Sequence, residues 1–205
     1  MITQTKETQE KITPEVALTY LKEGNARFVK NLKADRNLLE QAKKTSSGQF
    51  PFATVLSCID SRVSAELIFD QGIGDIFSVR IAGNIANDDI LGSMEFATKL
   101  AGSKLIVVLG HTRCGAVGGA VKQVEMGNLT GLLDKIHPAV QTVKQNFDFE
   151  VSDSRFMDEV VKQNVHNVAD EIKHRSPILN QMVSDGKIEI VEGVYSVDTG
   201  EVVFY

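Results

Sequence analysis

Three short apolar runs stand out along the chain, and each has the composition of a buried strand. They are FATVLS at 52–57, DIFSVRIA at 75–82 and KLIVVLG at 104–110. All three are compact and contain β-branched residues, which is typical of strands that are covered on both faces. The pattern therefore predicts three strands at the centre of a sheet.

Helical patterns lie between and after these runs. Ser64 to Gln71 and Asn87 to Leu100 separate the predicted strands. Further helices are predicted at 115–127, 129–145 and 154–175, the last of which ends at Ser176-Pro177. Strands that alternate with helices favour right-handed βαβ units, and such units build a parallel sheet with helices on its faces.

The two ends of the chain carry patterns of their own. Thr13-Pro14 is a helix start, and helical spacing of apolar residues predicts an amphipathic helix at 14–32, followed by a shorter one at 38–44. The tail alternates around Asp198-Thr199-Gly200, which is typical of a hairpin that adds an edge strand. The predicted fold class is α/β, with a mostly parallel central sheet flanked by helices. No repeat or linker divides the chain, so we expect a single domain over 1–205, with a helical arm at 1–45 and an α/β core at 50–205.

Composition excludes several classes of function. The net charge of −5 argues against a nucleic-acid surface, which normally carries a basic excess. No apolar run reaches the ~18 residues of a membrane-spanning helix, and the polar N-terminus lacks the apolar core of a signal peptide. The chain as given is therefore expected in the cytoplasm, although a leader removed beforehand would leave no trace. The chain has only two cysteines, which favours metal binding or catalysis over a disulfide-stapled fold.

Both cysteines follow predicted strands. Cys58 comes directly after the first strand, in SCIDSR, and His111 and Cys114 follow the third, in GHTRC. Ligands of open α/β sheets bind at the carboxyl ends of strands, so these three side chains can converge although they are far apart in sequence. Two thiolates and an imidazole suit Zn²⁺, and three protein ligands leave one position open for a water molecule.

Asp60 and Arg62 lie on the same side of the extended segment as Cys58. A carboxylate so close to a metal would accept a hydrogen bond from a zinc-bound hydroxide and orient it. Arg62 would hold that carboxylate ionised. If Arg62 moved away, Asp60 could bind the metal instead and close the site, so the resting fourth ligand stays open at this stage.

SCIDSRV and GHTRCGAV together resemble the two zinc motifs of the β-class carbonic anhydrases, C-x-D-x-R and H-x-x-C. The resemblance implies reversible hydration of CO₂ to bicarbonate and a proton, with one zinc per subunit. It makes Cys58, His111 and Cys114 the metal ligands and Asp60 and Arg62 the catalytic pair. It also implies a homodimer with active sites at the subunit interface, and it leaves open whether dimers pair into a homotetramer.

The resemblance extends to four substrate-binding positions. Gln49 matches a glutamine that the plant-type branch offers to substrate, Phe77 matches a wall of the CO₂ pocket, and Gly115 supplies a backbone amide. Phe96 occupies a place where many members have tyrosine. The chain has no tryptophan, whereas the bicarbonate-inhibited branch uses one in its regulatory site, so we expect the plant-type branch.

Two alternative functions remain open at this stage. The same scaffold could hydrolyse carbonyl sulfide or carbon disulfide, which are linear molecules that a zinc-bound hydroxide could also attack. A non-catalytic zinc module for assembly is the other alternative, although structural zinc does not require the Asp60–Arg62 pair. For the leading hypothesis, two thiolates reduce the charge on zinc, so activity is expected to rise towards alkaline pH.

Overall fold

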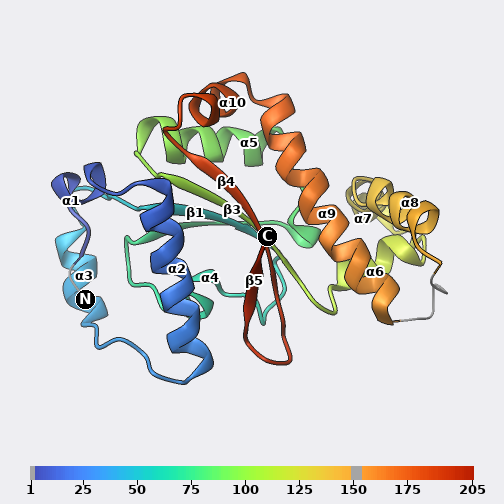
Figure 1. The fold of residues 1–205 in the computed structure, drawn as a ribbon, viewed down its shortest axis with the longest axis horizontal. Helices are drawn as coiled ribbons and strands as arrows, with labels where there is room; N and C mark the ends of the chain where they lie inside the picture. Colours follow the sequence, from blue (N-terminus) through green and yellow to red (C-terminus); the bar gives the residue numbers. More distant parts are fainter. Residues whose placement is uncertain (1–2, 149–153) are drawn as a thin grey trace.

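The computed structural model describes residues 3–148 and 154–205, and at its centre lies a five-stranded sheet (Figure 1). The strand order is β2-β1-β3-β4-β5. The first four strands run parallel, and β5 pairs antiparallel with β4. The bounds are Ala53–Ser57 for β1, Ile76–Arg80 for β2, Leu105–His111 for β3, Glu189–Tyr195 for β4 and Val202–Phe204 for β5. The predicted α/β fold class, with its parallel sheet and added edge strand, is confirmed.

The burial of the strands follows from this order. Every residue of β1 and β3 is buried, because both strands have a neighbour on each side and helices on both faces. The outer strand β2 and the penultimate strand β4 instead mix buried and partly or fully exposed residues. Continuous apolar runs therefore marked the central strands correctly.

Helices cover both faces of the sheet (Figure 1). Leu105, Val107 and Leu109 of β3 belong to a core shared with α2 and α4, whereas Ile106 and Val108 of the same strand pack on the side of α5, α9 and α10. Successive residues of a strand point to opposite faces, so β3 contributes to both cores. The bounds are Lys6–Glu10 for α1, Pro14–Val29 for α2, Leu38–Lys44 for α3, Ala65–Ile68 for α4, Asp88–Glu95 for α5, Gly115–Val121 for α6, Gly127–Leu133 for α7, His137–Asn146 for α8, Ser154–Arg175 for α9 and Pro177–Ser184 for α10.

Several predicted helix boundaries were wrong. The helix predicted at 14–32 ends at Val29, and Asn31 then adopts a left-handed conformation with φ of 54°. Ser176-Pro177 ends α9 as expected but also starts α10, because the Ser176 hydroxyl accepts a hydrogen bond from Leu179 N. The stretch expected at 87–100 is α5 followed by a π-helical turn at Phe96–Leu100. Helix α1 was not anticipated, and the helix predicted at 129–145 is divided between α7 and α8.

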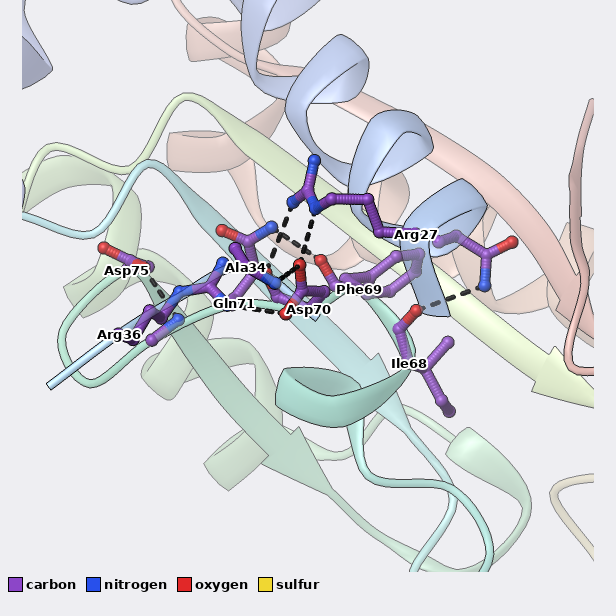
Figure 2. Close-up of polar contacts among 10 residues, drawn as sticks. Arg27, Ala34, Arg36, Ile68, Phe69, Asp70, Gln71 and Asp75 are labelled. Carbon is purple, nitrogen blue, oxygen red and sulfur yellow. Dashed lines mark hydrogen bonds and ion pairs between the residues drawn. The ribbon is translucent and has the colours of Figure 1, made fainter. Parts of the chain in front are cut away.

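A buried ionic cluster attaches the N-terminal arm to the core (Figure 2). Asp70, just after α4, accepts hydrogen bonds from Arg27 Nε at 2.5 Å, Arg36 Nη1 at 2.5 Å and Ala34 N at 3.1 Å. Its carbonyl oxygen also accepts hydrogen bonds from both arginines. One carboxylate therefore joins α2 and the segment after it to the connection between β1 and β2.

Within the described residues, no helix is long and apolar enough to cross a bilayer.

Candidate active site and metal centre

Three side chains of the kinds that bind metals meet at the carboxyl edge of the sheet. Cys58 follows β1, His111 is the last residue of β3, and Cys114 immediately precedes α6. Since β1 and β3 are parallel neighbours, their carboxyl ends lie side by side. One ligand atom from each residue lies within 4.8 Å of the other two, and all three side chains are buried. The structure thus brings together the residues that the sequence pattern selected as a metal site.

The hydrogen bonding of His111 shows that one of its ring nitrogens is free for a metal. Nδ1 lies 2.9 Å from the Thr112 carbonyl oxygen, to which it can donate. Nε2 is buried and has no hydrogen-bond partner among the described residues. Leaving a buried polar atom unpaired costs roughly 1–3 kcal/mol, so such atoms call for an explanation. A metal ion bound by Nε2 and two sulfurs would satisfy it, so these residues fit the zinc that the donor set suggests.

The pKa values of the two cysteine thiols are shifted in opposite directions. A hydrogen bond with Cys114 lowers the pKa of Cys58 to about 4 against the opposing effect of burial, with further help from His111 and the Gly83 N–H. The same contact, together with burial, raises the pKa of Cys114 above its usual value. Thiolate ligation of a metal requires both sulfurs to be deprotonated, so binding there would release any proton that the pair still holds.

Asp60 is held by Arg62 in a tight bidentate pair. Its Oδ1 accepts from the Arg62 backbone N and Nε, each at 2.9 Å, and Oδ2 accepts from Nη2 at 2.9 Å. These hydrogen bonds from Arg62 hold the pKa of Asp60 far below its usual range. Asp60 does not belong to the group of converging ligand atoms. Its carboxylate is therefore ionised and engaged by Arg62.

Backbone carbonyl groups around this pair are also fixed. Arg80, the last residue of β2, donates to the Cys58 carbonyl oxygen at 3.0 Å and to the Asp60 carbonyl oxygen at 2.7 Å. Arg62 Nη2 reaches the carbonyl oxygen of Arg113 at 3.4 Å. The segment after β1 is thereby tied both to β2 and to the loop after β3. Arg80 was not predicted as a site residue, although a charged residue at the end of a predicted strand was a visible signal.

The predicted substrate-binding residues lie in different places. Gly115 is the first residue of α6 and follows Cys114 directly, so its backbone lies beside the metal ligands. Gln49 is exposed ahead of β1, at the opposite end of a strand about 17 Å long.

Phe77 and Phe96 lie together but away from the ligands. Their ring centroids are 6.3 Å apart, and they line one groove beside the outer strand β2. Phe77 pairs with Thr54, four positions before Cys58, which is about 13 Å along the strand. One chain therefore brings Gly115 to the metal site but leaves Gln49 and the two phenylalanines apart from it.

A second set of residues supports Cys58 and was not found from the sequence. Gly83 N donates to Cys58 Sγ at 3.3 Å, and Asn164 Nδ2 donates to the Gly83 carbonyl oxygen at 2.9 Å. The available signal was an asparagine within the apolar stripe of the helix predicted at 154–175.

Comparison with known proteins agrees with this architecture. Residues 53–202 match the family described as Carbonic anhydrase. Carbonic anhydrase 2 of Mycobacterium tuberculosis is 35% identical over 196 residues, which cover 93% of this chain and 92% of that protein. The carbonic anhydrase of Mycolicibacterium smegmatis is also 35% identical, over 92% of each chain.

Solved structures show the same relationship. The β-carbonic anhydrase CcaA superposes with a TM-score of 0.75 at 26% identity, over 92% of this chain and 94% of that chain. A second match comes from a study of two tetrameric β-carbonic anhydrases from Sordaria macrospora. It has a TM-score of 0.73 at 21% identity and covers 79% of this chain and 84% of that chain. This second match shows the shared fold. With the family match over most of the chain, these likenesses establish that the protein belongs to the β class of the carbonic anhydrase family.

Proposed function

We propose that the protein catalyses reversible hydration of carbon dioxide to bicarbonate and a proton, with one zinc ion held by Cys58, His111 and Cys114. The observation that carries this proposal is the convergence of these three side chains beside the Asp60–Arg62 pair, with the buried Nε2 of His111 lacking a hydrogen-bond partner among the described residues. Zinc bound there would supply a Lewis acid that makes water nucleophilic near neutral pH.

Asp60 orients the attacking water by accepting a hydrogen bond from it. An acceptor in this role must stay ionised, and Arg62 ensures this by holding the pKa of Asp60 low. Arg62 also fixes the carboxylate plane, because both of its side-chain donors bind separate carboxylate oxygens. The Gly115 N–H, at the start of α6, donates to the carboxylate oxygens that form as the carbon is attacked.

The remaining substrate contacts come from a second copy of the chain. Gln49 and Phe77 lie too far along the strands to reach the metal ligands of their own chain, and Phe96 packs beside Phe77 in the same groove. A homodimer in which these residues face the partner's metal site would use all of them, and two such dimers could associate as a tetramer. We also propose the plant-type branch, since the chain has no tryptophan for the inhibitory site, and a cytoplasmic location.

Asp60→Asn tests the catalytic assignment. The variant keeps the shape of the side chain but weakens the pairing with Arg62, so kcat/KM for CO₂ hydration should fall by roughly 100-fold or more while zinc content stays at one per chain. Asp198→Asn is the matched control, because Asp198 also pairs with an arginine near the site, Arg113, but is half exposed. Stopped-flow measurement of both variants decides the matter: wild-type activity in zinc-loaded Asp60→Asn would show that the assignment is wrong.

Nothing in the described residues or in the relatives favours carbonyl sulfide or carbon disulfide as the substrate, or a purely structural zinc. Turnover of carbonyl sulfide by the wild-type protein, measured beside CO₂ hydration, would still separate the two activities. We expect CO₂ hydration to be much the faster.

A further inference from the structure

Asn164 is a polar side chain buried in an apolar face of α9. It is 2% exposed, and its helix neighbours Val160, Val161 and Val168 are buried as well. Burial of an amide is unfavourable unless its polar atoms find hydrogen-bond partners. The Nδ2 of Asn164 finds one in the Gly83 carbonyl oxygen, at 2.9 Å, although the two residues are 81 positions apart in sequence. An amide at this position thus links α9 to the turn that follows β2.

Gly83 makes the next contact in the chain. Its N–H donates to Cys58 Sγ at 3.3 Å, so the turn at Ala82–Asn84 reaches a proposed metal ligand. Gly83 has φ of +68°, and a Cβ there would lie 2.5 Å from Cδ1 of Ile136. Glycine suits this position, but it is also the residue with the greatest backbone freedom. The Asn84 N–H closes this turn from within by donating to the Ile81 carbonyl oxygen at 3.0 Å, and Asn164 adds a contact that holds it from outside.

We propose that Asn164 is a positioning residue for the metal centre: by holding the Gly83 carbonyl oxygen, it fixes the turn that directs the Gly83 N–H towards the Cys58 sulfur. The proposal rests on the metal-binding role assigned above to Cys58. Hydrogen bonds from outside the coordination sphere orient metal ligands and tune their affinity, and loss of such partners commonly weakens metal binding 10- to 100-fold. Asn164 is not one of the converging ligand residues and acts through the turn.

Zinc retention and cobalt spectra test this role. Asn164→Ala removes the donor, and Asn164→Leu removes it while keeping the same branched arrangement of side-chain heavy atoms and a residue that favours helix. Both variants, loaded with zinc, should release it to a competing chelator about 10-fold faster than the wild type. When Co²⁺ replaces zinc, the sulfur-to-cobalt absorption band should shift in both variants, because a sulfur that loses an N–H donor gives more charge to the metal.

Asn25→Ala provides the matched control. Asn25 is also a buried asparagine, and its Nδ2 donates to two backbone carbonyl oxygens, those of Ile68 at 3.1 Å and Gly200 at 2.9 Å. It lies on α2, away from the metal ligands, so Asn25→Ala should lower the thermal midpoint and leave zinc release and the cobalt spectrum unchanged.

The possible results separate the two proposals. Zinc release and cobalt spectra that match the wild type in either folded Asn164 variant would overturn the positioning role. Faster release without a spectral change would overturn it too, since that pattern reports general destabilisation. A wild-type protein that binds neither zinc nor cobalt would overturn the proposed metal centre itself.

Discussion

Replacing Asp70 with asparagine should weaken the attachment of the N-terminal arm and lower the stability of the whole fold. The side chains of Asp70 and Arg36 are each 6% exposed, and that of Arg27 is 26% exposed. Removing one partner of a buried ion pair typically costs ~3–5 kcal/mol. Asparagine keeps an oxygen for the Ala34 N–H and tolerates the φ of 44° at this position, so no backbone strain is added. We therefore expect a loss near the low end, about 3 kcal/mol.

The effect should also depend on pH. Burial raises the pKa of Asp70, but hydrogen bonds from Arg27 and Arg36 outweigh burial and leave the pKa below its usual value. A carboxyl group whose pKa is lowered by folding stabilises the protein above its unfolded-state pKa of about 3.9, and that contribution disappears as pH falls through the folded-state pKa. The difference between wild type and Asp70→Asn should thus be constant near neutral pH and shrink below about pH 4.

Urea unfolding followed by circular dichroism, at fixed protein concentration, measures this difference. Asp198→Asn serves as the control, because the Asp198–Arg113 pair is exposed and should contribute less than about 1 kcal/mol. The reasoning would be refuted if Asp70→Asn lost no more stability than Asp198→Asn, or if its deficit persisted unchanged at acidic pH.

Two further predictions concern catalysis. Gly115→Pro removes one backbone N–H at the first position of α6, where proline is compatible with the helix and with the extended Cys114 before it. We expect kcat/KM to fall roughly 100-fold while zinc content and folding are retained. Unchanged kcat/KM would exclude a role for that amide. Two thiolate ligands would make a zinc-bound water less acidic than in a three-histidine site, where the pKa of that water is ~7. We therefore expect kcat to rise between neutral and alkaline pH. A flat pH profile in stopped-flow assays would contradict this.

The central strands and the convergence of the three candidate metal ligands were predictable because local patterns indicate them. Strands β1 and β3 are buried on both faces, so their sequences are compact and mostly apolar. Cys58, His111 and Cys114 could be grouped because strand ends of a parallel sheet share an edge. Their convergence needed only the order of the elements, which the alternation of strands and helices supplies.

Other features depend on contacts between distant segments, and the sequence does not show these. The link from Asn164 to Gly83 joins α9 to the turn after β2, and the Asp70 cluster joins the arm to the crossover after α4. Helix α10 was missed for a different reason: Ser176-Pro177 is compatible both with the end of one helix and with the start of the next. The assignments of Gln49, Phe77 and Phe96 to the substrate site stay predictions, because a single chain does not bring them to the candidate metal ligands.

X-ray absorption at the zinc edge, combined with metal analysis of the purified wild-type protein, tests whether the three side chains hold a zinc ion. We expect one zinc per chain with two sulfur ligands at about 2.3 Å, one imidazole nitrogen at about 2.0–2.1 Å and one light atom from solvent. Cys58→Ser should remove one sulfur from this shell. Protein without stoichiometric metal, or a zinc shell that lacks both sulfurs, would contradict the proposed metal centre and the chemistry built on it.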